Sequence, residues 1–282
     1  FDELGITTDT LETISSQVRG TILGQYCRNP QSLERAVSAW KGARRHFEVT
    51  LTPQQIQQKL QSKLRWLSLK ERSFWEGVLA RNEAAKQNLK YLALSLDEDG
   101  NPIPVVNTDP ATLLFLEDFT GRILNGHVKA EQVLDLVRPF LLPYPVGLFV
   151  EGLGPLVSND AYASETVWEN FAKDPYHSPR TVWGREVNLL LLGLAKQLSA
   201  CYDATGQLRN AGLESYAAQL RRAFDDVVRA VTASGLKHNE LWSYRIEEGT
   251  LFPVRYGSSS DVQLWNVTDL AVQYLTTQIP SP

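Results

Sequence analysis

Carboxylates, amides and flat aromatic side chains gather in four segments of the chain that we expect to be loops: residues 107–109, 151–162, 174–183 and 238–245. Tryptophan and tyrosine faces stack on the apolar C–H surface of a sugar ring, while neighbouring polar groups bind its hydroxyls. The chain has no GxxxxGK[ST] motif, and no GxGxxG motif follows a predicted strand, so the usual phosphate-binding loops are missing. This composition favours a carbohydrate ligand over a nucleotide.

Side chains in these segments are the candidate ligand-binding residues, and each also has an ordinary structural alternative. A loop tryptophan commonly packs against the core, and a histidine in a turn commonly bonds to backbone. The interpretation therefore depends on the recurrence of such side chains at successive helix ends. The candidates are Asn107, Asn159, Tyr176, His177, Trp183 and Trp242.

The overall composition excludes several classes of protein. The 282 residues are 43% apolar and 21% charged, which argues against intrinsic disorder. The net charge of −4 argues against non-specific binding to nucleic acid or anionic membranes, and no apolar run is long enough to span a bilayer. Cys27 and Cys201 lie far apart and outside any Cys/His cluster, so we expect no metal site and no cofactor, and leave their pairing open.

Apolar residues recur at helical spacing along most of the chain, so helices dominate the predicted structure. The C-terminal third alternates between a mostly apolar helix, an amphipathic one and another apolar one, which indicates inner and outer layers of helices. Only a short hairpin at 247–256 breaks the pattern, and no linker composition divides the chain, so we predict one domain over 1–282. The predicted helices cover 8–26, 30–47, 54–66, 69–96, 110–124, 129–142, 164–173, 184–202, 213–235 and 261–276.

Several segments together resemble a known enzyme group. They are Pro143–Leu148, Val157–Tyr162, Tyr176–Trp183, Glu240–Tyr244 and Gln263–Trp265. The chain from about residue 90 to about residue 276 is similar to the six-hairpin (α/α)6-toroid glycosidases, relatives of trehalases, glucosidases and glycogen-debranching-type enzymes. The resemblance implies an all-α toroid, incomplete here because the sequence predicts fewer helices than six hairpins need. It departs from the group at Ser178–Arg180, where relatives tend to have a glycine.

The resemblance also implies a reaction. Enzymes of this architecture usually hydrolyse glycosidic bonds with inversion, using a carboxylic acid and a water-activating carboxylate about 6.5–9.5 Å apart. Glu240 occupies the position of the base, with Glu247 or Glu248 as fallback. Asp109 is the nominated acid, although it is also well placed to cap a helix, and Glu151 and Asp160 remain open as acids. Glu186 is expected to make an inner-helix polar contact.

The expected function is thus hydrolysis of a short oligosaccharide or glycoside of α-gluco type. The alternative is a non-catalytic carbohydrate-binding or scaffold protein on the same helical fold. A helical-repeat interaction protein lacks a regular period, and a lyase or isomerase on a similar toroid stays open. The chain begins at Phe1 and contains no Met, which suggests processing and weakly favours a secreted protein. The sequence leaves the sugar and the oligomeric state open.

Overall fold

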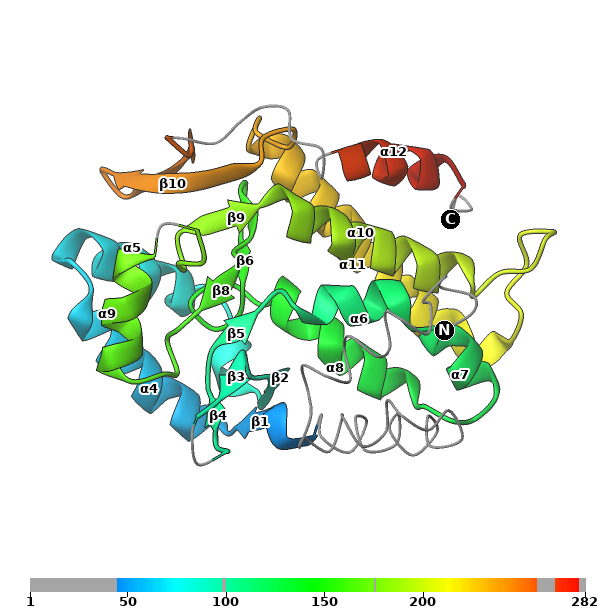
Figure 1. The fold of residues 1–282 in the computed structure, drawn as a ribbon, viewed down its shortest axis with the longest axis horizontal. Coiled ribbons are helices and arrows are strands. Elements are labelled where there is room, and N and C mark those ends of the chain that lie inside the picture. Colours follow the sequence, from blue (N-terminus) through cyan, green and yellow to red (C-terminus); the bar gives the residue numbers. More distant parts are fainter. Residues whose placement is uncertain (1–44, 98–99, 175, 258–266, 279–282) are drawn as a thin grey trace, which may run out of the picture. The chain divides into compact units, whose positions relative to one another are not determined.

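The computed structural model describes residues 45–97, 100–174, 176–257 and 267–278 (Figure 1). The chain divides into two compact units, Phe1–Glu48 with Leu96–Asn101, and Val49–Ser95 with Pro102–Pro282. In the first unit a short 3-10 helix, Arg45–Phe47, is described. Most of the predicted helices over 8–26 and 30–47 and the start of the one over 261–276 lie outside the described residues, as do Cys27 and Gln263–Trp265. The single-domain interpretation stays a prediction, and the candidate functional residues all belong to the second unit.

The prediction of an all-α toroid is wrong, because the described residues combine helices with several small sheets. The strands are β1 (Glu48–Leu51), β2 (Leu89–Leu92), β3 (Ser95–Leu96), β4 (Pro102–Ile103), β5 (Val106–Asn107), β6 (Phe149–Val150), β7 (Gly154–Pro155), β8 (Ser158–Asn159), β9 (Thr181–Trp183), β10 (Leu241–Glu247) and β11 (Thr250–Arg255). Strands of two or three residues are too short to show an alternating apolar pattern in the sequence. For this reason the sequence predicts loops at segments that the structure shows as short paired strands.

Two sheets hold segments that carry candidate functional residues. β5 pairs antiparallel with β8, with Val106 opposite Asn159 and Asn107 opposite Ser158. β10 pairs with β11 and, on its other edge, with β9, where Leu241 lies opposite Trp183. The predicted hairpin at 247–256 is therefore larger than expected and belongs to a three-stranded sheet.

The helices lie close to their predicted positions in most cases. They are α4 (Pro53–Trp66), α5 (Leu69–Ala80), α6 (Pro110–Leu116), α7 (Phe119–Leu124), α8 (Ala130–Leu141), α9 (Glu165–Lys173), α10 (Gly184–Ser199), α11 (Glu214–Ala233) and α12 (Thr268–Gln278). α4 starts with the predicted cap, since the Thr52 side chain accepts from the Gln55 amide, and the Gln55 side chain accepts from the Thr52 amide. The helix predicted over 69–96 ends at Ala80. The helix predicted over 110–124 is split, because Asp118 caps α7.

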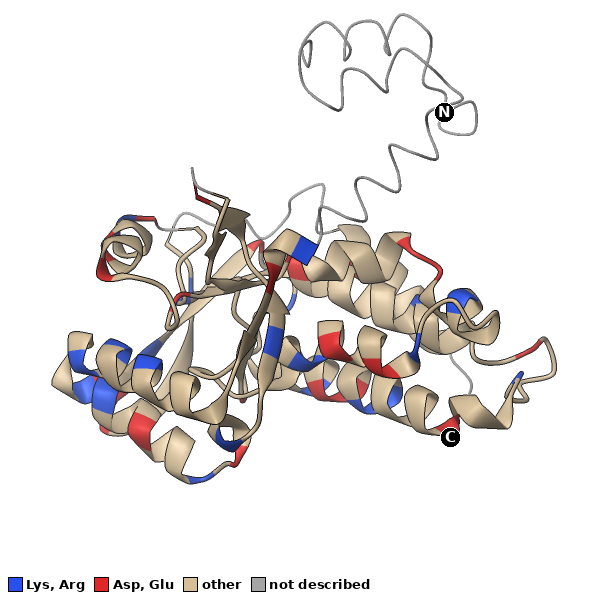
Figure 2. Ribbon diagram, turned by 90° about the horizontal axis from the view of Figure 1, so that it is seen from below, with Lys and Arg blue, Asp and Glu red and all other residues tan. Residues whose placement is uncertain are grey.

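α10 is the central helix of the described core. It packs against α6, α11 and α12, and its leucines at positions 190, 194 and 198 have no exposed surface. Among its neighbours, α11 buries Leu220, Phe224 and Val227 and turns its charged side toward solvent, as its pattern predicts. Figure 2 shows acidic and basic residues interspersed along the drawn helices.

The one cysteine that the structure describes, Cys201, is a buried thiol just after α10. Its Sγ lies 3.4 Å from the Gln197 carbonyl oxygen. Burial raises the pKa of this thiol to about 11, so it is protonated at neutral pH. It therefore acts as a packed apolar side chain in this core.

Candidate active site at the starts of two helices

α6 and α10 pack closely and run in the same direction. A Cβ added at Gly193 of α10 would lie 2.8 Å from Leu114 Cβ of α6, so only glycine permits this approach. Further along both helices, Gln197 Nε2 donates to the carbonyl oxygens of Leu114 and Glu117, each at 2.8 Å. Gly193 thus faces Leu114, and Gln197 reaches on to Glu117. Contacts later in α10 are made with residues later in or just after α6, so the two helices are parallel.

This parallel packing places Asp109 and Glu186 at the same end of the helix pair. At 1.5 Å per helical residue, Asp109 lies about 8 Å before Leu114, and Glu186 lies about 10 Å before Gly193. In Figure 1, α6 leads away from β5 and α10 leads away from β9, both in the same direction. The charge of Asp109 is close enough to raise the pKa of Glu186, which agrees with this placement.

Glu186 lies in the first turn of α10, and the residue is only 8% exposed. Burial raises its pKa, the nearby Arg185 guanidinium opposes that change, and the like charge of Asp109 adds to it. The Arg185 contact is long, with Nη1 at 3.5 Å from Glu186 Oε1. The pKa of Glu186 is therefore above its ordinary value, and the group can hold a proton closer to neutral pH than an exposed glutamate can.

Asp109 occupies the N-cap position of α6, but in the described structure its side chain makes no capping hydrogen bond. Its backbone amide is held instead by the Asn107 side chain, with Oδ1 accepting at 3.1 Å. The residue as a whole is exposed, yet surrounding protein partly desolvates the carboxyl group. That desolvation raises its pKa, and the charge of His177 opposes the change. The carboxylate is thus not committed to the helix cap that the sequence suggested.

His177 is brought to this position by its backbone and its ring. The Ser158 hydroxyl of β8 donates to the His177 carbonyl oxygen, which ties the loop to the β5–β8 sheet. Asp174 Oδ1 accepts from the His177 amide at 3.0 Å, and Oδ2 lies 2.9 Å from the ring Nδ1. Burial raises the pKa of Asp174, but hydrogen bonds from the amides of His177 and Tyr176 and from the imidazole together lower it. A carboxylate on Nδ1 favours a proton there and leaves Nε2 to interact with a ligand.

Trp183 completes the cluster. Its ring lies edge-on to His177 at a centroid distance of 5.7 Å, and the Arg185 guanidinium lies 6.0 Å from its centroid. Its buried indole Nε1 has no hydrogen-bond partner among the described residues. We call Asp109, His177, Trp183, Arg185 and Glu186 the helix-start cluster. Within the described part of the chain, it combines two carboxyl groups with an indole donor that has no partner.

Glu240 reaches the same region through its backbone. The Gly184 amide at the start of α10 donates to the Glu240 carbonyl oxygen at 2.8 Å, and β10 begins at the next residue. The residue is half-buried. Its role as general base stays a prediction.

The structure places the other predicted binding residues in structural roles or away from the cluster. Asn107 Nδ2 donates to the Leu92 and Val105 carbonyls, and Asn159, which has no exposed surface, donates to those of Pro145 and Gly147. Trp242 is 1% exposed, and its Nε1 donates to the Leu153 carbonyl at 3.0 Å. Tyr176 is exposed and stacks on Tyr256. Amides and indoles that bind sugars also satisfy buried backbone, so residue type alone could not separate these uses.

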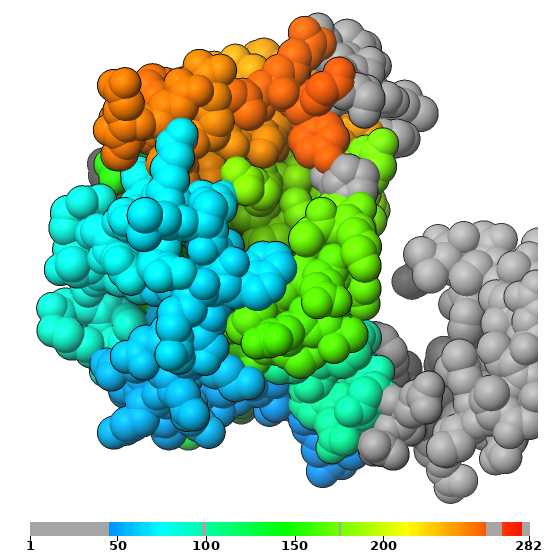
Figure 3. Space-filling view, turned by 90° about the vertical axis from the view of Figure 1, so that its left-hand side faces the viewer, coloured from blue at the N-terminus to red at the C-terminus, as the bar shows by residue number. Residues whose placement is uncertain are grey.

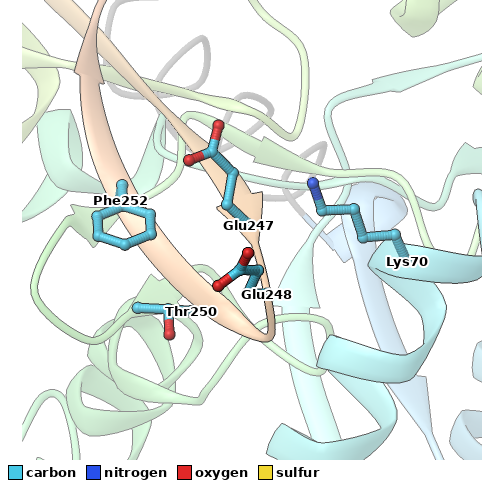
Figure 4. Close-up of a pocket in the computed structure, with 5 residues that line it drawn as sticks. All are labelled: Lys70, Glu247, Glu248, Thr250 and Phe252. Carbon is cyan, nitrogen blue, oxygen red and sulfur yellow. The ribbon is translucent and has the colours of Figure 1, made fainter.

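The fallback bases lie elsewhere. Glu247 and Glu248 border an open hollow of about 480 Å³ between the β10–β11 turn and the start of α5 (Figure 4). In Figure 4 the Lys70 side chain extends from α5 toward this hairpin. Glu151 is exposed in the turn between β6 and β7, and Asp160 is ion-paired with Lys63.

Sequence reasoning missed Glu186 as a functional candidate. Its position two residues after Gly184, inside an apolar helix, indicated only a polar contact. No local sequence signal could have found it, because its neighbour Asp109 is set by the packing of α6 against α10.

Within the described ranges, no group of three or more His, Cys, Asp or Glu side chains could hold a metal ion. The same part of the chain contains no helix that combines the length and the apolar character needed to cross a membrane.

The chain matches no protein-family model, no curated protein and no solved structure.

Proposed function

We propose that the helix-start cluster hydrolyses glycosidic bonds, with Glu186 as the general acid and Asp109 as the general base. The observation that supports this is one pair of carboxyl groups in unequal environments. Burial raises the pKa of Glu186, and Asp109 raises it further, whereas the Asp109 residue is exposed, and the charge of His177 opposes the rise that desolvation causes in its pKa. Glycosidases need such a division, because one carboxyl group must be protonated while the other is ionised.

In the proposed reaction, protonated Glu186 donates its proton to the glycosidic oxygen as the bond to the anomeric carbon breaks. Asp109 removes a proton from the water that attacks that carbon. Asp109 then releases its proton to solvent and Glu186 takes one up from solvent, which restores the starting protonation states. The Trp183 indole N–H, which has no hydrogen-bond partner among the described residues, is the proposed donor to a sugar hydroxyl. An inverting outcome on a short α-glucoside, expected from the sequence, stays a prediction of this proposal.

This assignment changes the roles expected from the sequence. Asp109 moves from acid to base, since Glu186 is the more buried carboxyl group. Glu240, whose carbonyl oxygen bonds to the start of α10, remains a third carboxylate to be tested. A variant series can separate the three.

The test is release of reducing sugar from a panel of glycosides by the whole chain and by matched variants. We expect Glu186→Gln and Asp109→Asn each to lower kcat by about 10²–10⁴-fold, the usual contribution of general acid–base catalysis. Glu165→Gln is the matched control, because Glu165 is an exposed first-turn glutamate of α9. NMR of the first-formed anomer reports inversion or retention.

Two results would contradict the proposal. One is that no glycoside in the panel is hydrolysed by the wild-type chain. The other is full turnover in both Glu186→Gln and Asp109→Asn. A loss confined to Glu240→Gln would likewise remove the assigned pair and return the base to the position implied by the resemblance.

A further inference from the structure

A second concave site, whose lining includes none of the five residues of the helix-start cluster, lies between α4, α5, α9 and β10. It is a pocket of about 220 Å³ that we call the ion-pair pocket. Figure 3 shows the side of the molecule where α4 and α5, in blue and cyan, border α9 and the residues that follow it, in green. Six aromatic side chains line the pocket: Trp66, Trp75, Tyr144, Trp168, Phe171 and Tyr244.

A buried ion pair forms the polar part of this pocket. Lys63 Nζ lies 2.9 Å from Asp160 Oδ2, and the two side chains are 2% and 1% exposed. Asp160 Oδ1 is also buried, but it has no hydrogen-bond partner among the described residues. A lysine ammonium has three protons to donate, and Asp160 accepts one of them. The pocket thus presents a buried acceptor with an unmet hydrogen bond beside a buried donor.

The charges of the pocket balance. Besides Lys63 and Asp160, its lining includes Arg180 and Glu71, which pair at 2.6 Å. Two cations and two anions leave no net charge to attract an ionic ligand, and an added buried charge would remain uncompensated. A neutral ligand avoids this penalty.

The aromatic rings do not form a vacant cage for a cation. Lys63 Nζ itself lies 4.3 Å from the Trp66 ring centroid and 4.9 Å from that of Trp168. The position that a ligand ammonium would take is therefore occupied by the chain's own lysine. Trp66 nevertheless remains 41% exposed, which leaves part of its surface for an apolar ligand face.

We propose that the ion-pair pocket binds a neutral polyhydroxylated ring, a monosaccharide or a cyclitol, as a site separate from the helix-start cluster. One ligand hydroxyl donates to Asp160 Oδ1 and accepts from Lys63 Nζ, because a hydroxyl group is both donor and acceptor. An apolar ring face lies against Trp66. The volume is below the roughly 300–1,000 Å³ of pockets for larger ligands and suits a single ring.

The test uses the whole chain with ¹⁵N-labelled tryptophan. Glucose, galactose and myo-inositol are the neutral probes, with acetate and tetramethylammonium as the charged ones. We expect at least one neutral probe to give saturable shifts of the Trp66 and Trp168 indole signals with a dissociation constant in the millimolar range. The charged probes should give none.

The decisive variant is the pair Lys63→Met with Asp160→Leu, which keeps the side-chain volume while removing the polar groups. Binding should be lost in this variant. It should be retained in Lys90→Met with Asp135→Leu, the matched change at an ion pair whose lysine is 57% exposed. Trp66→Ala gives a second test that leaves the buried pair intact, and we expect it to weaken binding severalfold.

The proposal is overturned if no neutral probe saturates, if acetate or tetramethylammonium binds instead, or if the double variant, once shown to be folded, binds as well as the wild type. Glu186→Gln separates this site from the proposed hydrolysis. That variant should keep the indole shifts whether or not the chain hydrolyses glycosides, because the ion-pair pocket does not include Glu186.

Discussion

The helix-start cluster and the ion-pair pocket both bury carboxyl groups, but they compensate them differently. Asp160 has a lysine at 2.9 Å, and burial raises its pKa while Lys63 opposes the change. Among the described residues, the cation in contact with Glu186 is Arg185 at 3.5 Å, and the like charge of Asp109 raises the pKa of Glu186 further. A buried carboxylate held by a close cation is neutralised in place, whereas one left with weak compensation can exchange a proton. This difference is the reason why we propose ligand binding at the ion-pair pocket and proton transfer at the helix-start cluster.

The largest expected effect is on the stability of the ion-pair pocket. Asp160→Leu alone leaves the Lys63 ammonium buried without its partner, which should lower the free energy of unfolding by about 3–5 kcal/mol. The double variant with Lys63→Met removes both charges and should be close to neutral. Urea denaturation of the two proteins measures the difference.

An equal loss in the single and double variants would show that side-chain packing, rather than the uncompensated charge, determines stability there. Lys90→Met with Asp135→Leu serves as the control for changing a more exposed ion pair, in which Asp135 also contacts Arg138 and Arg138 keeps Glu131 as a second partner. The comparison between the two regions requires that Lys63 and Asp160 stabilise each other.

A smaller effect of opposite sign is expected at the helix-start cluster. The folded-state pKa of Glu186 is raised, so between its ordinary value of 4.5 and the raised value the folded state binds more protons than the unfolded state. Stability therefore falls as pH rises through that window, and above it the ionised side chain destabilises the fold. Glu186→Gln should remove this cost and raise the melting temperature at pH 7 by a few degrees.

Below the ordinary pKa of glutamate the same substitution should have little effect, because wild-type Glu186 is then protonated in both states. Calorimetry at the two pH values, with Glu165→Gln as the control, measures the effect. A variant that is less stable than wild type at pH 7 would show that Glu186 is held there as a stabilising ion pair with Arg185.

The sequence predicted the helices best where a cap or a clear amphipathic pattern exists. The Thr52 cap of α4 and the apolar face of α11 are confirmed. The all-α class was wrong because β5, β8 and β9 are too short to show a period and pair with segments distant in the sequence. Such pairing depends on tertiary contacts that no local pattern records.

The candidate site was predictable only in part, because tertiary contacts also decide which side chains meet there. Loop composition singled out Asp109, His177 and Trp183, and the structure brings them together. Glu186 was not singled out, because its neighbour is set by the parallel packing at Gly193. Trp242 has the residue type of a sugar platform, yet its indole bonds to the Leu153 carbonyl in the core.

The central claim, that Asp109 and Glu186 are one electrostatically coupled pair, is tested most directly by titrating the Glu186 carboxyl carbon by NMR. Its signal is assigned by comparison with Glu186→Gln, and the titration is repeated in Asp109→Asn. We predict an apparent pKa above 4.5 in the wild type and a lower value once Asp109 is neutral. An unchanged pKa in Asp109→Asn, or a wild-type value at or below 4.5, would contradict the account.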